Sequence, residues 1–244
     1  MQVYYYEPNE IMLTNNSEQL MKSGLRPVPT DASFFDTDLS VLGKDGMTTK
    51  GILIADGPSA QQQQETMDFL KSIRSAGCLN PVICIMDMKN SQRAADLINS
   101  GADDVVVRPF KGVEIAARIN GINRRSYGHV SSSVVIGNIT AYFDGRDPDV
   151  NGKRLKLSHR EHAIFSHLAL QHGRVISKEN LYEAVYGMLD NQPFDKVIDV
   201  YICKLRKKLE NATEGQQYIE TVYGRGYKLA APDGEKIVEE AVMV

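Results

Sequence analysis

Residues Phe194–Glu210 read FDKVIDVYICKLRKKLE, and their spacing predicts a helix of about 15 residues. On a period of 3.6 residues, one narrow apolar stripe is formed by Ile198, Ile202, Leu205 and Leu209. The opposite face carries Lys196, Val200, Cys203, Lys204 and Lys207, with Arg206 and Lys208 on its flanks. We call Lys196, Lys204 and Lys207 the basic ridge. By itself the pattern is typical of a solvated surface helix or of a helix that offers its charged side to a partner.

The segments on either side of this helix favour the second interpretation, in which its charged side contacts a partner. Helical spacing is found in residues 158–171, where Ser158 and Glu161 form a capping box, and again in residues 177–186. After the basic helix, the sequence YGRGY at residues 223–227 is typical of a tight hairpin tip. Three helices followed by an arginine-tipped hairpin predict an α+β winged helix-turn-helix domain.

This arrangement suits double-stranded DNA. The major groove, about 12 Å wide, accepts one helix, and the hairpin can lay Arg225 against the neighbouring minor groove. Gly224 and Gly226 permit the turn and a close approach to a backbone. An ordinary tight turn without a DNA contact is the alternative interpretation of residues 223–227.

Strands and helices alternate along the first half of the chain. We expect strands at residues 2–6, 25–28, 51–55, 82–86 and 104–107, and helices at residues 11–23, 62–76, 91–100 and 111–125. Residues 29–50 carry no clear pattern. The alternation predicts a doubly wound α/β fold, in which helices cover both faces of a parallel sheet. The functional crevice of such a sheet lies at the carboxyl ends of its strands.

Four positions follow those strand ends, and we expect them around one site: Glu7, Asp56, Met86 or Asp87, and Arg108. Farther along, residues 126–133 (SYGHVSSS) are small and polar, as in a short linker. We therefore expect an N-terminal domain over residues 1–125, a linker over 126–133 and the winged-helix domain over 134–232. The acidic segment 233–244 is expected to be disordered.

Composition excludes several classes of protein. The sequence has no apolar run of membrane-span length and no leader pattern, so we expect a cytoplasmic protein without membrane contact. Cys78, Cys84 and Cys203 lack paired spacing, which predicts neither disulfides nor a metal site. No nucleophile–base pair, P-loop or dinucleotide fingerprint is present, which argues against an enzyme and against a cofactor. The net charge of −3 means that any DNA binding depends on local positive charge.

The segments KVIDVYICKLRKKLE and YIETVYGRGYKL resemble the effector domain of the OmpR/PhoB family of bacterial response regulators. GADDVVVRPF and EIAARINGINRR resemble the CheY-like (βα)5 receiver domain of that family. Within the family, AVYGMLD and the C-terminal segments are similar to CtrA-type cell-cycle regulators, and YFDGRDPDVNG to Rem/FtcR-type flagellar regulators. The resemblance implies a DNA-binding transcriptional regulator of flagellar or cell-cycle genes.

The resemblance assigns roles within the winged helix. It implies base-facing positions for Lys196, Val200, Cys203, Lys204 and Lys207, a DNA-backbone contact for Arg206, and a wing contact for Arg225 assisted by Tyr227. Tyr201 is also expected among the DNA-binding residues. Family members often have arginine or histidine where this chain has Tyr201 and Cys203, so their preferred DNA sequence does not transfer. The loop Gly187–Pro193 corresponds to the segment that contacts RNA polymerase in relatives.

The receiver-like half departs from the family pattern. Its acidic pair is reduced to Glu7, because Pro8 stands where the second acid belongs. Met86 replaces the usual hydroxyl residue, and Arg108 replaces the usual lysine. Asp56 remains at the phosphoacceptor position. Two interpretations stay open: a degenerate receiver that works without Mg²⁺-dependent phosphorylation, and a phosphorylated receiver served by a histidine kinase or phosphotransfer protein.

The resemblance also implies a homodimer. In the family, charge pairs on one face of the receiver join two copies, and matching positions here are Arg93, Asp103, Asp104, Glu114 and Arg118. Isolated surface pairs contribute only about 0–1 kcal/mol, so these charges are equally typical of a solvated surface. Several of them around an apolar patch can still set the orientation of a dimer, which would place two recognition helices on repeated half-sites.

Overall fold

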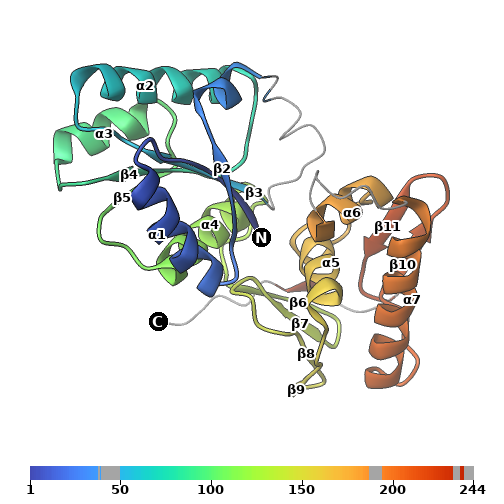
Figure 1. The fold of residues 1–244 in the computed structure, drawn as a ribbon. Helices are drawn as coiled ribbons and strands as arrows, with labels where there is room; N and C mark the ends of the chain where they lie inside the picture. Colours follow the sequence, from blue (N-terminus) through green and yellow to red (C-terminus); the bar gives the residue numbers. More distant parts are fainter. Residues whose placement is uncertain (38, 40–49, 187–193, 233–236, 239–244) are drawn as a thin grey trace. The chain divides into compact units, whose positions relative to one another are not determined.

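The computed structural model describes residues 1–37, 39, 50–186, 194–232 and 237–238 (Figure 1). The chain divides into two compact units, Met1–Asn123 and Arg124–Val244, which we call the N-terminal and C-terminal units. Within the described ranges, no helix is both long enough and apolar enough to cross a membrane.

The N-terminal unit contains a five-stranded parallel sheet with the strand order β2-β1-β3-β4-β5. The strands are β1 (Gln2–Tyr6), β2 (Arg26–Thr30), β3 (Lys50–Ala55), β4 (Val82–Met86) and β5 (Asp104–Val107). The predicted bounds of β4 and β5 are confirmed to the residue. Every residue of β3 and β4 is buried, as a continuous apolar run in a sheet covered on both faces predicts.

Helices cover both faces of this sheet (Figure 1). They are α1 (Glu10–Lys22), the 3₁₀ helix η1 (Ala32–Asp36), α2 (Ala60–Ser75), α3 (Ser91–Asn99) and α4 (Gly112–Ser126). Apolar side chains of α1 and α4 pack on one face, and those of η1, α2 and α3 pack on the other. The predicted doubly wound receiver-like fold is confirmed, with a 3₁₀ helix in its second strand–helix repeat.

The C-terminal unit combines two small antiparallel sheets with three helices. Its elements are β6 (Ser133–Ile136), β7 (Ile139–Tyr142), β8 (Asp149–Val150), β9 (Lys153–Arg154), α5 (His159–Leu170), α6 (Lys178–Tyr186), α7 (Phe194–Ala212), β10 (Ile219–Val222), β11 (Gly226–Leu229) and β12 (Ile237–Val238). The predicted capping box opens α5, with Ser158 N donating to Glu161 Oε2 at 2.7 Å. Strands β10 and β11 form the predicted hairpin after α7.

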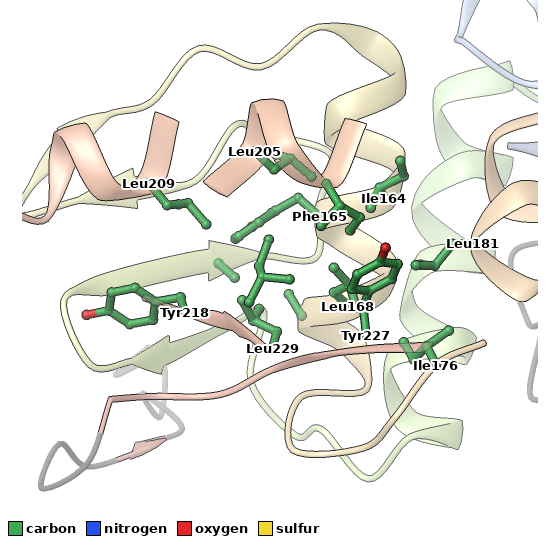
Figure 2. Packing of buried hydrophobic residues seen from close by; sticks show 14 of the residues in the cluster. Ile164, Phe165, Leu168, Ile176, Leu181, Leu205, Leu209, Tyr218, Tyr227 and Leu229 are labelled. Atoms are coloured by element: carbon green, nitrogen blue, oxygen red, sulfur yellow. The ribbon is translucent and has the colours of Figure 1, made fainter. Parts of the chain in front are cut away.

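The apolar stripe of α7 closes the core of the C-terminal unit. Its members Ile198, Ile202, Leu205 and Leu209 are all buried, so the helical spacing is confirmed. Figure 2 shows Leu205 and Leu209 pointing from α7 toward Phe165 and the strands beneath. Burial of four large aliphatic side chains stabilises the helix by roughly 1.5–3 kcal/mol each, before chain entropy is subtracted.

The C-terminal segment differs from the predicted disorder at Ile237 and Val238. These residues form β12, which pairs antiparallel with Ile136 and Val135 at the edge of β6. The physical reason is that an open strand edge offers unpaired N–H and C=O groups to any β-branched segment within reach. Residues 233–236 and 239–244 lie outside the described part of the chain.

Candidate nucleic-acid interface and acidic pocket

The outward face of α7 gathers the exposed side chains of Val200, Cys203, Lys204 and Lys207 over the buried stripe. The Lys204 ammonium lies 5.6 Å from the centre of the Tyr201 ring. Lys207 has no ion pair with any residue in the described ranges. Lys196 belongs to α7, but its side chain lies outside the described residues, as does the whole of the predicted polymerase loop, Gly187–Pro193.

Tyr201 is engaged by the protein itself. Its hydroxyl accepts a hydrogen bond from Nη1 of Arg160 on α5 at 2.9 Å. A hydrogen bond with Tyr186, followed by the one from Arg160, lowers the pKa of Tyr201. The structure therefore places the Tyr201 hydroxyl at the junction of α5, α6 and α7, whereas we expected this residue to bind DNA.

Arg206 turns away from the basic ridge and binds the hairpin. Its Nε donates to the Ile219 carbonyl oxygen at 2.9 Å, and its Nη2 donates to Thr221 Oγ1 at 2.7 Å. The guanidinium also lies 5.7 Å from the centre of the Tyr227 ring. These contacts to β10 and β11 differ from the DNA-backbone role expected for Arg206, because a helical wheel gives the direction of a side chain but not its distant partner.

Tyr227 is buried in the core rather than exposed on the wing. Its hydroxyl donates to Asp199 Oδ1 at 2.5 Å, and Asp199 Oδ2 lies 2.9 Å from Lys178 Nζ. Burial, together with the hydrogen bond to Asp199, raises the pKa of Tyr227 to about 12. The expected assistance of Tyr227 in a wing contact is therefore replaced by a link between β11, α7 and α6.

The hairpin tip presents Arg225 beside the exposed side chain of Tyr223. The Arg225 side chain is exposed and has no hydrogen bond or ion pair to the residues that the structure describes. Gly224 has a φ of +71° and Gly226 a φ of +133°. A Cβ on Gly226 would collide with the carbonyl oxygen of Ile176, so the close backbone approach at this glycine is to the protein itself. Sequence reasoning missed this contact; the pairing of Ile176 with Tyr227 gave no periodic signal.

In the N-terminal unit, Asp56 follows β3 and is bound by Arg93 of α3. Arg93 Nε donates to Oδ2 at 2.8 Å, and Nη2 donates to Oδ1 at 2.6 Å and to the Gln63 carbonyl oxygen at 2.7 Å. The side chains of Arg93 and Asp56 are 14% and 4% exposed. The hydrogen bonds to Asp56 raise the pKa of Arg93. Arg93 therefore lies in the pocket, not on the dimer face where we expected it.

Arg108 joins the other two carboxylates of this pocket. It donates from Nη2 to Glu7 Oε2 and from Nη1 to Asp87 Oδ1. Glu7 also accepts from the Tyr5 hydroxyl at 3.1 Å and from the Asn9 backbone N–H at 3.1 Å. We call Glu7, Asp56, Asp87, Arg93 and Arg108 the acidic pocket. Of the residues predicted to meet, Arg108 thus joins Glu7 and Asp87, whereas Asp56 is bound by Arg93; Met86, the last residue of β4, is buried. No group of three metal-ligating side chains is found in the described ranges.

The remaining residues of the expected dimer face are paired within the chain. Arg118 of α4 binds Asp104 at 2.6 Å and Glu114 at 2.7 Å. Asp103 instead binds Arg74 at 2.7 Å and accepts from the Val82 backbone N–H at 2.8 Å, which fixes the start of β4. Asp104, Glu114 and Arg118 therefore form one exposed cluster on β5 and α4, to which Asp103 does not contribute.

Comparison with known proteins bears on both units. Residues 152–229 match the family described as "Transcriptional regulatory protein, C terminal". The cell cycle response regulators CtrA of Brucella anthropi and Brucella ovis are each 38% identical over 168 residues, which cover 69% of this chain and 72% of the relative. Both relatives are named as cell cycle response regulators.

Solved structures were compared as well. The Thermotoga maritima response regulator DrrB, an OmpR/PhoB homolog, is 22% identical over 94% of this chain and 99% of its own, with a TM-score of 0.39. The Klebsiella pneumoniae RstA DNA-binding domain, solved in complex with the RstA box, is 26% identical over 40% of this chain and 96% of its own, with a TM-score of 0.35. By its 38% identity to the CtrA regulators over more than two thirds of both chains, this protein belongs to the OmpR/PhoB family of DNA-binding response regulators.

Proposed function

We propose that this protein is a sequence-specific transcriptional regulator that dimerises through its N-terminal unit and does not require Mg²⁺-dependent phosphorylation. We place its targets among flagellar or cell-cycle genes, as the similarity to CtrA suggests. The observation that carries the DNA-binding part is the exposed pair Lys204 and Lys207 on a helix whose other side is locked into the core.

The geometry of α7 and the hairpin suits two neighbouring grooves. A helix fits the major groove, where lysine donates to the acceptor atoms of guanine. Val200 and Cys203 stand beside the lysines and supply apolar contact, for example to a thymine methyl group. Arg225 at the free tip of the hairpin is proposed to enter the adjoining minor groove, where a narrow A·T-rich segment attracts arginine.

The acidic pocket supports independence from phosphorylation. Mg²⁺ requires near-octahedral oxygen ligands, whereas both oxygens of Asp56 accept from Arg93 and Glu7 is bound by Arg108. Pro8 offers no side-chain ligand. These residues do not fit a resident Mg²⁺. The guanidinium of Arg93 also lies where a donor would have to approach the Asp56 oxygens, because it occupies them both.

The exposed cluster on β5 and α4 supports a dimer. Arg118, Asp104 and Glu114 are between 29% and 42% exposed, so their pairs within the chain are worth only about 0–1 kcal/mol. Exchanging them for pairs with a second copy therefore costs little. The exposed apolar residues Ile98 on α3 and Val113 on α4 are proposed to supply the buried area between the copies.

Incubation with a small phosphodonor and Mg²⁺, followed by intact mass, tests the pocket. We expect no adduct on the wild-type protein, on Asp56→Asn or on Arg93→Gln, with an ordinary receiver as the positive control. A labile phosphoryl adduct on the wild type that Asp56→Asn lacks would favour the second candidate function. In that case the protein is a conventional response regulator, activated at Asp56 by a histidine kinase or phosphotransfer protein.

Genome-wide footprinting tests the DNA-binding part. We expect protected sites made of two repeated half-sites about one helical turn apart, as a symmetric or tandem dimer requires. Failure to retain any duplex at modest ionic strength would end the proposal. We further propose that residues 187–193 contact RNA polymerase; alanine substitutions there should lower transcription from a bound promoter without changing DNA affinity.

A further inference from the structure

We propose that Arg206 and Tyr227 are positioning residues that clamp the β10–β11 hairpin to α7, so that the basic ridge and Arg225 read DNA as one rigid body. The inference rests on the proposed function, because it concerns how two DNA contacts are held together. Neither residue is offered as a DNA contact of its own.

The first clamp is made by Arg206. Its two hydrogen bonds reach alternate residues of β10, one to the backbone at Ile219 and one to the side chain of Thr221. The guanidinium is planar and presents its donors in a fixed fork, so two bonds define the distance and the angle between α7 and β10. A lysine at this position keeps the charge but has a single point of attachment.

The second clamp is made by Tyr227 on the other strand of the hairpin. Its hydroxyl binds Asp199, which lies on α7 between the exposed Val200 and the buried Ile198. Hydrogen bonds to an ionised acceptor are short and roughly twice as strong as neutral ones. Lys178 binds the second oxygen of the same carboxylate, so α6 is fixed to the clamp as well.

A pair of backbone hydrogen bonds adds a third attachment of the hairpin, at Tyr227. Tyr227 N donates to the Ile176 carbonyl oxygen at 2.9 Å, and Ile176 N donates to the Tyr227 carbonyl oxygen at 2.8 Å. Arg225 stands two residues before this anchor, and its own N–H donates to the Val222 carbonyl oxygen at 2.9 Å. The backbone at Arg225 is therefore fixed relative to the segment that precedes α6, while Arg206 and Tyr227 fix the hairpin to α7.

Rigid coupling matters for binding because ordering a loop on DNA costs free energy that a preorganised element avoids. If the clamps hold, the wing contact forms whenever the helix contact forms. If the clamps are loosened, Arg225 is still present but its contact has to be ordered at each encounter. Loss of a clamp should therefore resemble loss of Arg225.

Hydrogen exchange of the full chain without DNA tests the clamps themselves. We expect Arg206→Lys and Tyr227→Phe to speed amide exchange in residues 219–229 by about tenfold or more, with exchange in α5 unchanged. The matched control is Arg154→Lys on the exposed strand β9, which should leave the hairpin unaffected. Unchanged exchange in the hairpin of both variants would overturn the inference.

A double-mutant cycle on a footprinted site tests the consequence for DNA. We expect Arg206→Lys and Arg225→Ala each to weaken binding by about tenfold, and the double variant to bind no worse than Arg225→Ala alone, because both changes remove one contact. If the double variant instead loses affinity by the product of the two single losses, Arg206 contacts DNA directly and the inference is overturned. If the wild-type protein binds no duplex, the proposed function is wrong. The hydrogen-exchange experiment still decides in that case whether the clamps exist.

Discussion

Arg93 and Arg108 bring two guanidinium groups to the three carboxylates of the acidic pocket. Asp87 is 53% exposed, but the other carboxylates, Glu7 and Asp56, are each only 4% exposed, and charges buried to that degree are stable only when they are paired and hydrogen-bonded. Removing one member leaves the other buried and uncompensated, which costs far more than the net worth of the pair. The pair of Arg93 with Asp56 is therefore expected to matter for folding as well as for chemistry.

Arg93→Gln should destabilise the N-terminal unit by on the order of 2–4 kcal/mol, since the Asp56 carboxylate stays buried without its partner. The double variant Arg93→Gln, Asp56→Asn should recover part of that loss. Lys71→Gln is the control, because its pair with Asp68 is 62% and 59% exposed and should contribute almost nothing. Denaturant unfolding measures all three, and equal effects of Arg93→Gln and Lys71→Gln would contradict the expectation.

The two described lysines of the basic ridge can be tested singly. Lys204→Ala or Lys207→Ala should weaken binding to a footprinted site by on the order of 1–3 kcal/mol if the lysine reads a base edge. Lys153→Ala, an exposed lysine on β9, serves as the control for a general loss of positive charge. Titration of labelled duplexes gives the affinities. An unchanged affinity removes that lysine from the base-reading set.

We expect His167 to make the stability of the C-terminal unit depend on pH. Complete burial lowers the pKa of this imidazole from 6.5 to about 4. Between pH 6.5 and pH 4, His167 is protonated in the unfolded chain but neutral in the folded protein. The free energy of unfolding is therefore unaffected by this group above pH 6.5 and falls as the pH drops toward 4. The loss is on the order of 2–3 kcal/mol.

His167→Leu should remove this component, leaving a flatter stability profile between pH 7 and pH 4. His162→Leu is the control, because His162 is not fully buried. Unfolding of the C-terminal unit at several pH values measures the difference. Identical slopes for wild type and His167→Leu would show that another group is responsible.

At the scale of elements, the β10–β11 hairpin depends on two glycines with different requirements. Gly224 needs only a positive φ, since nothing lies close to its Cβ position. Gly226 needs a positive φ and also abuts the backbone of Ile176. Substitutions at the two positions therefore distinguish the cost of a strained backbone from the cost of a steric clash.

Gly224→Ala should cost about 1 kcal/mol of stability for the left-handed backbone. Gly226→Ala should cost on the order of 3 kcal/mol or more, because neighbouring backbone has to move. Thermal unfolding compares the two variants with the wild type. If Gly226→Ala costs no more stability than Gly224→Ala, the hairpin does not pack on the segment at Ile176.

The elements themselves were largely predictable from sequence, and the reason is physical. A 3.6-residue period records the buried face of α7, and short apolar runs mark the strands β4 and β5, so the stripe and the bounds of both strands followed directly. Pairings between distant segments leave no such record. The partners of Arg93 and Arg206, and the strand at Ile237, appear only when the fold brings residues far apart in sequence together.

At the scale of the whole molecule, the proposed dimer makes the output depend on concentration. Arg118→Glu places like charges beside Asp104 and Glu114, so it should raise the dissociation constant of the dimer by about tenfold or more. Sedimentation measures this directly, with Lys71→Glu as a control on α2.

The same Arg118→Glu variant should lose affinity for a double site but keep its affinity for an isolated half-site, because α7 is untouched. Equal losses on both duplexes would mean that the change disturbs DNA binding by another route. An unchanged dissociation constant would remove the cluster on β5 and α4 from the interface.

The arginine that holds Asp56 is part of the chain and cannot be washed out, chelated or diluted. Under the proposed function, both oxygens of Asp56 are held by Arg93 from the moment of folding, so we expect this contact to be independent of cellular magnesium and of the supply of high-energy phosphate. A signal that travels through this pocket must first pull Arg93 off its carboxylate. Where no such signal exists, promoter occupancy depends on the concentration of the protein, which is set by its synthesis and breakdown.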